Sequence, residues 1–315
     1  MREVEALGDG IWVIDSGYLR PCMDALHLIV QDGRAALVES GTTHSVPRVQ
    51  AALQQIGIAP EDVDWLLLTH VHLDHAGGAG ALLQVLPNAQ LVVHPRGVRH
   101  MVEPSRLWAG TVAVYGEAFA REVYGEVLPV PAARVVEATE GRVIDLAGRR
   151  INVMDAPGHA RHHVCYFDSL SRGWFTGDAF GLSYRETHVG TRAFVFPATT
   201  PVQFEPAVMH ATIDRLLAHE PACMFLTHYS RVADVTRLAA DLHRLIADFV
   251  EIAEATANVA EDMQKGLIRA ALETLLRREA AEQGWALQGN EVARLYATDL
   301  ELNAQGLQTW LKSRT

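Results

Sequence analysis

The sequence predicts a mixed α/β protein that ends in a helical region, and two observations support this prediction. Short apolar runs of strand length alternate with helical patterns along the chain up to His228. After His228 the composition shifts to helix formers, and apolar residues recur at a spacing that lines one face of a helix. We therefore expect one domain over residues 1–232 and a C-terminal helical region over residues 233–315.

The elements of the first domain follow in chain order. A second set of strands and a helix repeats the first half in outline. The stretch 95–131 carries Trp108, Tyr115, Phe119 and Tyr124, and we expect it to be helical and to cover a cleft. The expected strands are 11–14, 25–30, 35–38, 63–68, 90–93, 151–156, 173–177 and 222–227, and the expected helices are 46–56, 79–86 and 204–218.

Three more helices are expected in the C-terminal region, near 238–252, 266–280 and 291–312. Packing in a core is the simplest explanation of their apolar stripes, and the sharper alternatives are a subunit interface or a wall of the substrate pocket. If the helices pack on the first domain or on a second copy in a homodimer, truncation after residue 232 should cause aggregation or loss of the dimer.

One segment concentrates potential metal ligands. Residues 69–78 read Thr-His-Val-His-Leu-Asp-His-Ala-Gly-Gly, so His70, His72, Asp74 and His75 follow directly on an apolar strand. Imidazole binds zinc, iron and other transition metals, and a neighbouring carboxylate can bind a second cation. The glycines after the motif allow a close approach of the backbone. We interpret this segment as half of a two-metal site.

Three later apolar runs each lead into a polar residue that can supply a further ligand: His159, Asp178 and His228. With this order of motifs the chain resembles the metallo-β-lactamase superfamily, in its glyoxalase II-like and uncharacterised hydrolase branch. The pattern of that superfamily is H-x-H-x-D-H, then G-H, then G-D, then a late His, and all of its ligand positions are filled here. The similarity extends from about residue 10 to about residue 230, and four ordered motifs together are specific.

The resemblance implies an αββα sandwich with an appended helical region and a dinuclear metal centre. Its cofactors are two divalent ions, zinc in the first place, with iron or manganese as alternatives. The implied ligands are His70, His72 and His159 for one metal and Asp74, His75 and His228 for the other, with Asp178 bridging the two.

This ligand set favours hydrolysis. Two cations about 3.5–4 Å apart hold a water between them and lower its pKa towards about 7. Asp74 and Asp178 are the candidate proton acceptors. The loop 180–201 follows Asp178 and is expected to set the choice of a small acyl substrate, with Tyr184 as a candidate catalytic donor to the developing oxyanion.

The composition limits the binding partners and the cellular compartment that we expect for the protein. The net charge is −11, with 27 Lys and Arg against 38 Asp and Glu, so the chain lacks the basic field that binds nucleic acid. The N-terminus has acidic residues where a secretory signal has an apolar core, and no run of eighteen apolar residues is present. We expect a cytoplasmic protein without a membrane partner, in which Cys165 and Cys223 are buried, inert thiols.

Two positions bear on the support of the ligands. His163 matches the second His of the family pattern G-H-x-x-G-H, and we expect it to support the site rather than to bind a metal. Glu39 stands where relatives commonly have Asp, a departure that affects a contact bracing the ligand loop and leaves every ligand position unchanged.

The expected function is hydrolysis of an ester, lactone or thioester by a metal-bridged water. The C-terminal region lacks the cluster of basic residues that holds glutathione in glyoxalase II, which disfavours a glutathione thioester. Alternatives are a mononuclear iron persulfide dioxygenase, a β-lactamase, a phosphodiesterase or nuclease, and a catalytically silent metal-binding module. The acidic balance disfavours a phosphodiester substrate, and flavodiiron proteins have Glu where His72 stands.

Overall fold

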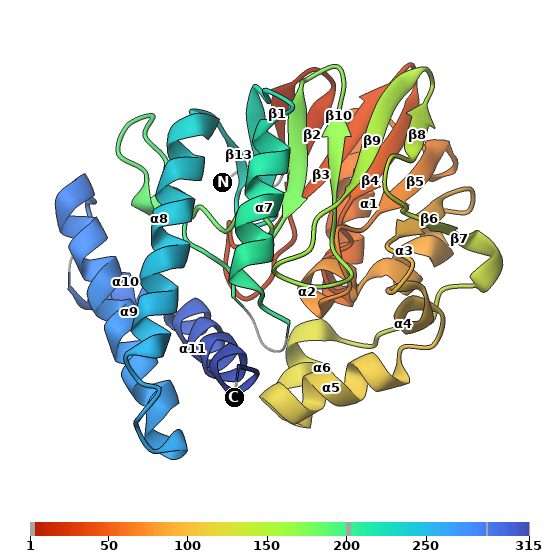
Figure 1. The fold of residues 1–315 in the computed structure, drawn as a ribbon. Helices are drawn as coiled ribbons and strands as arrows, with labels where there is room; N and C mark the ends of the chain where they lie inside the picture. Colours follow the sequence, from red (N-terminus) through yellow and green to blue (C-terminus); the bar gives the residue numbers. More distant parts are fainter. Residues whose placement is uncertain (1–3, 200–202, 288, 315) are drawn as a thin grey trace. The chain divides into compact units, whose positions relative to one another are not determined.

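The computed structural model of the protein describes residues 4–199, 203–287 and 289–314 (Figure 1). It divides into two compact units, each assembled from separate stretches of chain. The first contains residues 1–156, 162–177 and 221–231, and the second contains residues 157–161, 178–220 and 232–315. The predicted boundary at residue 232 follows a different division, because 157–161 and 178–220 group here with the C-terminal helices. That boundary stays a prediction.

The described strands form two sheets. The seven strands of the first sheet, in spatial order, are β1 (Val4–Gly8), β2 (Ile11–Asp15), β3 (Ala25–Gln31), β4 (Arg34–Val38), β5 (Val63–Leu67), β6 (Gln90–Val93) and β7 (Val135–Glu137). The six strands of the second sheet are β13 (Ser230–Val232), β12 (Cys223–Leu226), β11 (Gly173–Gly177), β10 (Val164–Asp168), β9 (Arg149–Asp155) and β8 (Val143–Leu146).

Strand direction brings the functional loops to common sheet edges. Strands β4, β5, β6 and β7 are parallel, and so are β11 and β12. Parallel strands end at the same edge of their sheet, so the loops that follow them lie close together. Glu39 directly follows β4 and the ligand motif follows β5, which explains how residues thirty positions apart come into contact.

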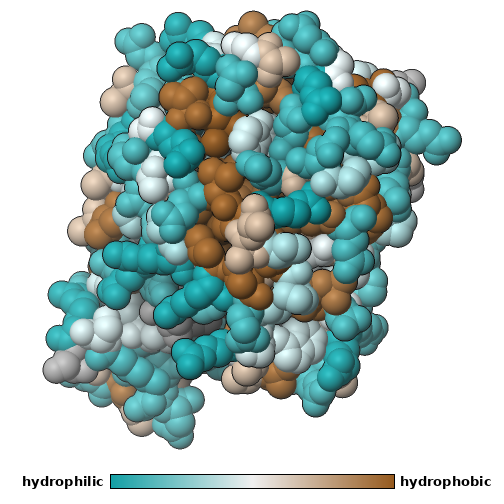
Figure 2. Space-filling view, turned by 90° about the vertical axis from the view of Figure 1, so that its right-hand side faces the viewer, coloured by the Kyte–Doolittle hydropathy of each residue, from teal (hydrophilic) through white to brown (hydrophobic). Residues whose placement is uncertain are grey.

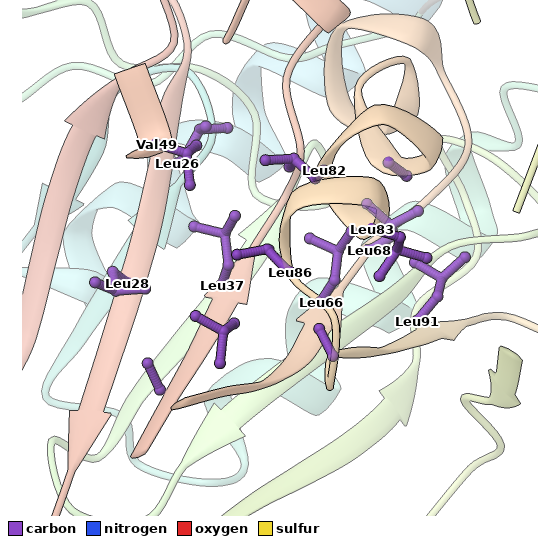
Figure 3. Close-up of a cluster of buried hydrophobic side chains, with 14 of the residues drawn as sticks. Leu26, Leu28, Leu37, Val49, Leu66, Leu68, Leu82, Leu83, Leu86 and Leu91 are labelled. Carbon is purple, nitrogen blue, oxygen red and sulfur yellow. The ribbon is translucent and has the colours of Figure 1, made fainter. Parts of the chain in front are cut away.

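Two apolar layers hold the first unit together. Buried side chains of both sheets, including Ile29, Tyr166 and Phe225, form one cluster. A second cluster lies between the first sheet and the helices α1 (Val46–Ile56) and α3 (Ala79–Val85), and Figure 3 shows its leucines from strands and helices pointing toward one another. Within this unit the layers are therefore helix, sheet, sheet, as the amphipathic patterns require.

The stretch predicted to be helical between 95 and 131 forms three helices, α4 (Val98–Val102), α5 (Ser105–Tyr115) and α6 (Glu117–Tyr124). Gly116 separates α5 from α6 with a φ of +83°, a conformation that residues with a Cβ rarely adopt. The buried face of α6 carries Ala120 and Tyr124. The helical prediction for this stretch is therefore confirmed.

The second unit is built from α7 (Pro206–Leu217), α8 (Val235–Glu254), α9 (Glu261–Gln283), α10 (Asn290–Leu295) and α11 (Ala297–Lys312). Its core is aromatic: Phe194 contacts Trp285, and Phe196 contacts Phe249, with ring centroids 4.8 Å and 5.1 Å apart. Leu238, Leu242, Leu245 and Phe249 of α8 are fully buried. Ile268 and Leu272 of α9 and Val292 of α10 are fully buried as well, which confirms the core packing predicted for the stripes of those helices.

One predicted helix is divided into two helices in the structure. The sequence pattern predicts a single helix over 291–312, but Tyr296 separates α10 from α11 with a φ of −99° and a ψ of 17°. The Tyr296 side chain is fully buried, and its ring packs against Tyr184 and Phe196 at 5.2 Å each. Burial of this ring in the aromatic core accounts for the break, which local periodicity does not reveal.

The outer surface is mixed in polarity. Figure 2 shows one face of the molecule, on which hydrophobic side chains form an irregular band bordered by hydrophilic ones. Such mixing is ordinary, because more than half of a folded protein's accessible surface is apolar. Among the described residues, no helix combines the length and the apolar character needed to cross a membrane.

The leucine cluster of the first unit should contribute strongly to stability. Leu66 lies in this cluster and is fully buried (Figure 3). Leu66→Ala removes buried methyl groups and leaves a cavity, so we expect the free energy of unfolding to fall by about 2–5 kcal/mol in urea denaturation. Leu170 is 55% exposed. The control Leu170→Ala should change that free energy by less than about 0.5 kcal/mol, and an equal effect of both variants would contradict this account.

A buried histidine should make the first unit sensitive to acid. His27 of β3 lies against Phe175 and Phe225, and burial lowers its pKa from 6.5 to about 3. The unfolded chain therefore binds a proton below pH 6.5 that the folded chain excludes until about pH 3. The stability that His27 contributes is complete above pH 6.5 and declines as the pH falls through this window.

Measured between pH 6.5 and pH 5, the unfolding free energy of the wild type should fall more steeply than that of His27→Leu. We expect the slopes to differ by about 1 kcal/mol per pH unit, because the variant lacks this titrating group. Parallel slopes would show that His27 titrates alike in both states.

Candidate metal centre

The ligand motif folds into a loop and one short helix. His70 and His72 lie in the loop after β5, and α2 (Leu73–Ala76) carries Asp74 and His75. The glycines after α2 permit a tight contact: a Cβ on Gly78 would lie 2.5 Å from the Thr42 carbonyl oxygen. The sequence pattern therefore requires glycine here for close packing of two backbone segments, as expected.

Three ligand-type side chains of the first unit converge. Asp74, His75 and His228 each offer one ligand atom, and these atoms lie within 4.8 Å of one another. The Asp74 Oδ2 atom is 3.5 Å from His75 Nε2 and 3.8 Å from His228 Nε2. The predicted second metal position thus has its three side chains gathered within the first unit.

The carboxylate of Glu39 orients the His75 ring through the ring nitrogen Nδ1, while the other nitrogen, Nε2, lies near Asp74. It is fully buried and accepts hydrogen bonds from four donors. His75 Nδ1 donates at 2.9 Å, which leaves the Nε2 atom unprotonated and on the side of Asp74. The other donors to Glu39 are the Thr69 backbone N–H at 3.2 Å, the Thr69 hydroxyl at 2.5 Å and the Thr227 hydroxyl at 3.1 Å.

Glu39 also reaches His70 through one hydroxyl. Because the Thr69 hydroxyl donates to Glu39, its oxygen accepts from His70 Nδ1 at 3.0 Å. The proton on Nδ1 leaves His70 Nε2 as a lone-pair donor, and this atom lies 2.8 Å from His72 Nδ1. At this distance His72 Nδ1 donates a hydrogen bond to His70 Nε2, so the two rings meet at these nitrogens. The Glu that replaces the family's Asp therefore braces the ligand loop.

His228 has a carboxylate partner of its own. Its Nδ1 atom donates to Asp24 Oδ1 at 2.7 Å, and Asp24 is fully buried. Burial raises the pKa of Asp24 to about 6, while the neighbouring His228 acts in the opposite direction. A carboxylate that accepts the second ring N–H of a metal-binding histidine fixes the ring and increases its basicity.

Sequence reasoning missed Asp24. An Asp before a strand is common in turns, so its type and position give no functional signal. The backbone hydrogen bond from Ala25 N–H to the Thr227 carbonyl joins β3 to the end of β12 and places Asp24 next to His228. This contact depends on the folded sheets and lies beyond local sequence patterns.

The remaining predicted ligands belong to the second unit. His159 Nδ1 donates to the Ala198 carbonyl at 2.8 Å, and its Nε2 atom lies 3.3 Å from Asp178 Oδ2. Both side chains are buried. As with His75 and His228, a backbone or carboxylate acceptor on Nδ1 leaves Nε2 able to bind a cation. The assignment of individual metals to these residues stays a prediction.

The donor set fits divalent transition metals. Imidazole nitrogens and carboxylate oxygens are ligands of zinc, iron and manganese, and three of the histidines already have Nδ1 occupied by an acceptor. Two of these acceptors are buried carboxylates, which is the arrangement that supports metal-binding histidines in proteins. The side chains present therefore suit the metals that the sequence predicts.

Four other residues singled out from the sequence have defined surroundings. The His163 ring lies nearly parallel to that of His70, with centroids 4.8 Å apart, in a position that supports the ligand. Cys165 and Cys223 are buried, and burial raises the pKa of Cys223, so both fit the predicted inert thiols. Tyr184 is fully buried, and its hydroxyl donates to the Asp299 carboxylate at 3.1 Å.

Comparison with known proteins identifies the family of the chain. Residues 20–228 match the family model described as the metallo-beta-lactamase superfamily. The chain belongs to this superfamily. The fold it shares is the αββα sandwich, here with additional C-terminal helices.

Relatives within the superfamily are distant. The metallo-beta-lactamase fold-containing protein ST1585 of Sulfurisphaera tokodaii is 30% identical over 45% of this chain and 51% of its own length. A hydroxyacylglutathione hydrolase of Xanthomonas euvesicatoria is 30% identical over 54% of this chain and 51% of its own. The chain thus spans about half the length of the curated relatives it matches.

Solved structures of the superfamily share the fold. The crystal structure of ST1585 from Sulfolobus tokodaii has a TM-score of 0.66 at 21% identity, covering 96% of this chain and 99% of that one. The metallo-beta-lactamase family protein TTHA1429 of Thermus thermophilus has a TM-score of 0.65 at 20% identity, covering 98% and 94%. At these identities the likeness concerns architecture alone.

Loss of the buried brace should weaken metal binding. Glu39→Gln keeps the shape of the side chain but removes the charge that orients His75 and, through Thr69, His70. We expect the affinity for zinc to fall by about 10- to 100-fold in a competition titration with a chelator. Glu122→Gln, an exposed control on α6, should leave the affinity unchanged. Equal affinities of both variants and the wild type would show that Glu39 does not orient the ligands.

Proposed function

We propose that the protein is a dinuclear metal-dependent hydrolase that cleaves an ester, lactone or thioester bond. The observation that supports this most is the set of histidines whose Nδ1 atoms are occupied by buried acceptors, so that their Nε2 atoms are prepared for cations. Relatives named hydroxyacylglutathione hydrolase add support for cleavage of an acyl bond.

In this proposal His70, His72 and His159 hold one cation, Asp74, His75 and His228 hold the other, and Asp178 contacts both. This assignment follows the order of the family motifs. When bound, two divalent ions, with zinc as our first choice, lower the pKa of a water and polarise the bond to be cleaved. Asp74 and Asp178 are the carboxylates proposed to accept a proton, and Glu39 and Asp24 hold the histidines in position.

Metal stoichiometry tests the dinuclear proposal. Elemental analysis of the zinc-saturated wild type should give close to two metal ions per chain. Asp178→Ala should impair both sites together because it removes the shared ligand, whereas His228→Ala should mainly loosen one ion. The panel of substrates for wild-type activity should include lactone, thioester, phosphodiester and β-lactam.

Two results would contradict the assignment. Equal loss of both metals in the two variants would remove the distinct role of Asp178. A maximum of one metal, with iron preferred and oxygen consumed in the presence of a persulfide, would favour the dioxygenase alternative over a hydrolase.

The oxyanion role of Tyr184 is a separate proposal, with a separate test. Loss of one oxyanion donor lowers kcat by about 100-fold or more, so Tyr184→Phe should have this effect while metal content stays unchanged. If the hydroxyl serves only its hydrogen bond to Asp299, the variant should instead lower the melting temperature and leave kcat unaltered. Steady-state kinetics and thermal unfolding of the same preparation separate these outcomes.

We further infer a small-molecule substrate, a cytoplasmic location and a homodimer held by the C-terminal helices. The acidic composition supports the absence of nucleic-acid partners. Cell fractionation and light scattering of the full chain test location and oligomeric state.

A further inference from the structure

Two histidines meet at the contact between helices α7 and α8 of the second unit, and neither is among the residues assigned to the metal centre. His210 lies on α7 and His243 on α8, 33 positions apart in the sequence. Their Nδ1 atoms are 2.6 Å apart, and their rings are nearly parallel, with an interplanar angle of 13° and centroids 4.9 Å apart. The pair of imidazole nitrogens is therefore a product of the fold.

The two helices hold the rings in place. Helices α7 and α8 pack against each other and lie side by side (Figure 1). Ile213 of α7 and Leu242 and Ile246 of α8 are fully buried, whereas His210 and His243 are half-buried. An apolar core thus fixes the two helices, while the rings remain accessible to solvent. Ligand side chains carried on packed helices lose little freedom when an ion binds.

Asp214 favours one protonation state of His243. It lies one turn after His210 on α7, and its Oδ1 atom is 3.2 Å from His243 Nε2. A negative charge beside Nε2 favours the proton on that nitrogen, which leaves the lone pair on Nδ1. His210 Nδ1 then donates to His243 Nδ1 across the 2.6 Å contact. A single proton therefore lies between two nitrogens, in the position that a metal cation can take.

The charge and the spacing of the pair suit zinc. Burial lowers the pKa of His210, and the neighbouring His243 acts in the same direction, so His210 is neutral at pH 7, as a metal ligand must be. Zinc–imidazole bonds are about 2.0–2.1 Å long, so two nitrogens on one tetrahedral zinc lie about 3.3 Å apart. An increase of about 0.7 Å in the Nδ1 separation of 2.6 Å reaches this value, and a rotation of the two side chains supplies it.

We propose that His210 and His243 form a zinc site that shares no residue with the metal centre, and that Asp214 is the residue that positions His243. Water completes the coordination of the ion. When zinc binds, His210 Nδ1 releases its proton and Nε2 takes one up from solvent, so the ring stays neutral. The bound ion links α7 to α8 and stabilises their contact. This inference is independent of the reaction proposed for the metal centre.

Calorimetric titration of the full chain with zinc tests the site. Two protein ligands hold an ion less tightly than the larger ligand set of the metal centre, so protein that is saturated with zinc and then desalted should lose the ion from this site first. Titration of the desalted wild type should then fill one further site per chain. His210→Gln and His243→Gln should each remove this binding step. Asp214→Asn should weaken it about 10-fold, the cost of losing a carboxylate that orients a metal-binding histidine.

His219→Gln is the matched control, because it removes an exposed histidine from the same unit and should leave the binding step unchanged. The nitrogen chemical shifts of 15N-histidine-labelled wild type identify the ligands, since those of His210 Nδ1 and His243 Nδ1 should change together with the calorimetric step. Zinc should also raise the melting temperature of the desalted wild type but not that of His243→Gln, because the ion binds only where the two helices are in contact.

The difference between the wild type and His243→Gln measures this site, whatever the number of ions at the metal centre. A wild type that binds no more zinc than His243→Gln would overturn the proposal. Constant Nδ1 shifts of His210 and His243 during zinc binding would also overturn it, because the ion would then lie elsewhere. Circular dichroism verifies the fold of each variant. If the histidine variants fail to fold, the wild-type nitrogen shifts still decide the question, together with Asp214→Asn, whose side chain is 70% exposed. Unchanged affinity of Asp214→Asn would overturn the positioning role of Asp214.

Discussion

The carboxylate of Glu39 is the interaction on which the first unit's ligand loop depends. It lies at the end of β4, is fully buried, and receives donors from the segment after β5, from α2 and from the end of β12. A buried charge is stable only when its hydrogen-bonding capacity is used, and here four donors use it. Two of these donors, the His75 ring N–H and the Thr69 hydroxyl, also orient His75 and His70. The hydrogen bonds that stabilise the carboxylate therefore orient the ligands as well.

A second carboxylate, Asp24, repeats this principle for His228. Asp24 accepts from His228, and the strand contact that places it also closes β3 against the end of β12. The two carboxylates differ in surroundings, because Glu39 has four donors whereas burial raises the pKa of Asp24 to about 6. His228 is therefore held by a carboxylate whose Oδ2 oxygen has no hydrogen-bond partner among the described residues, whereas Glu39 accepts from four donors. The ligands of the first unit are unequal in this respect although the sequence pattern treats them alike.

Elements with strong local signals could be predicted from the sequence. The helix at α1 matches the predicted bounds, with a proline in its first turn and Gly57 in a left-handed conformation at its end. The strands β1, β7, β8, β10 and β13 are not among the predicted ones. Polar residues interrupt the apolar runs of β1, β8 and β13, so little periodicity remains in them. The break at Tyr296 depends on an aromatic core that forms only in the fold.

The site divides in the same way. The ligand residues were predictable because metal chemistry restricts their types and spacing, and those within the first unit come together. Their supporting groups were not, since Glu39 looked like a departure from a pattern and Asp24 like a turn residue. The role of each comes from a partner on a distant strand. The type and spacing of a ligand residue can be read from the local sequence. The protonation state that allows the residue to bind a metal is set by tertiary contacts.

The span of these contacts has a consequence for the order in which the protein matures. Glu39 and Thr227 are 188 positions apart, and Asp24 and His228 are 204 apart. Closing such long loops is slow relative to local structure, and it comes after the individual helices and hairpins. The His228 imidazole is therefore oriented only when the two ends of the first unit have met. In a nascent or truncated chain the histidines are not oriented, so they bind metals with low selectivity. High-affinity metal binding therefore indicates that folding is complete. Because the metal binds the folded chain, it stabilises that state over incompletely folded chains.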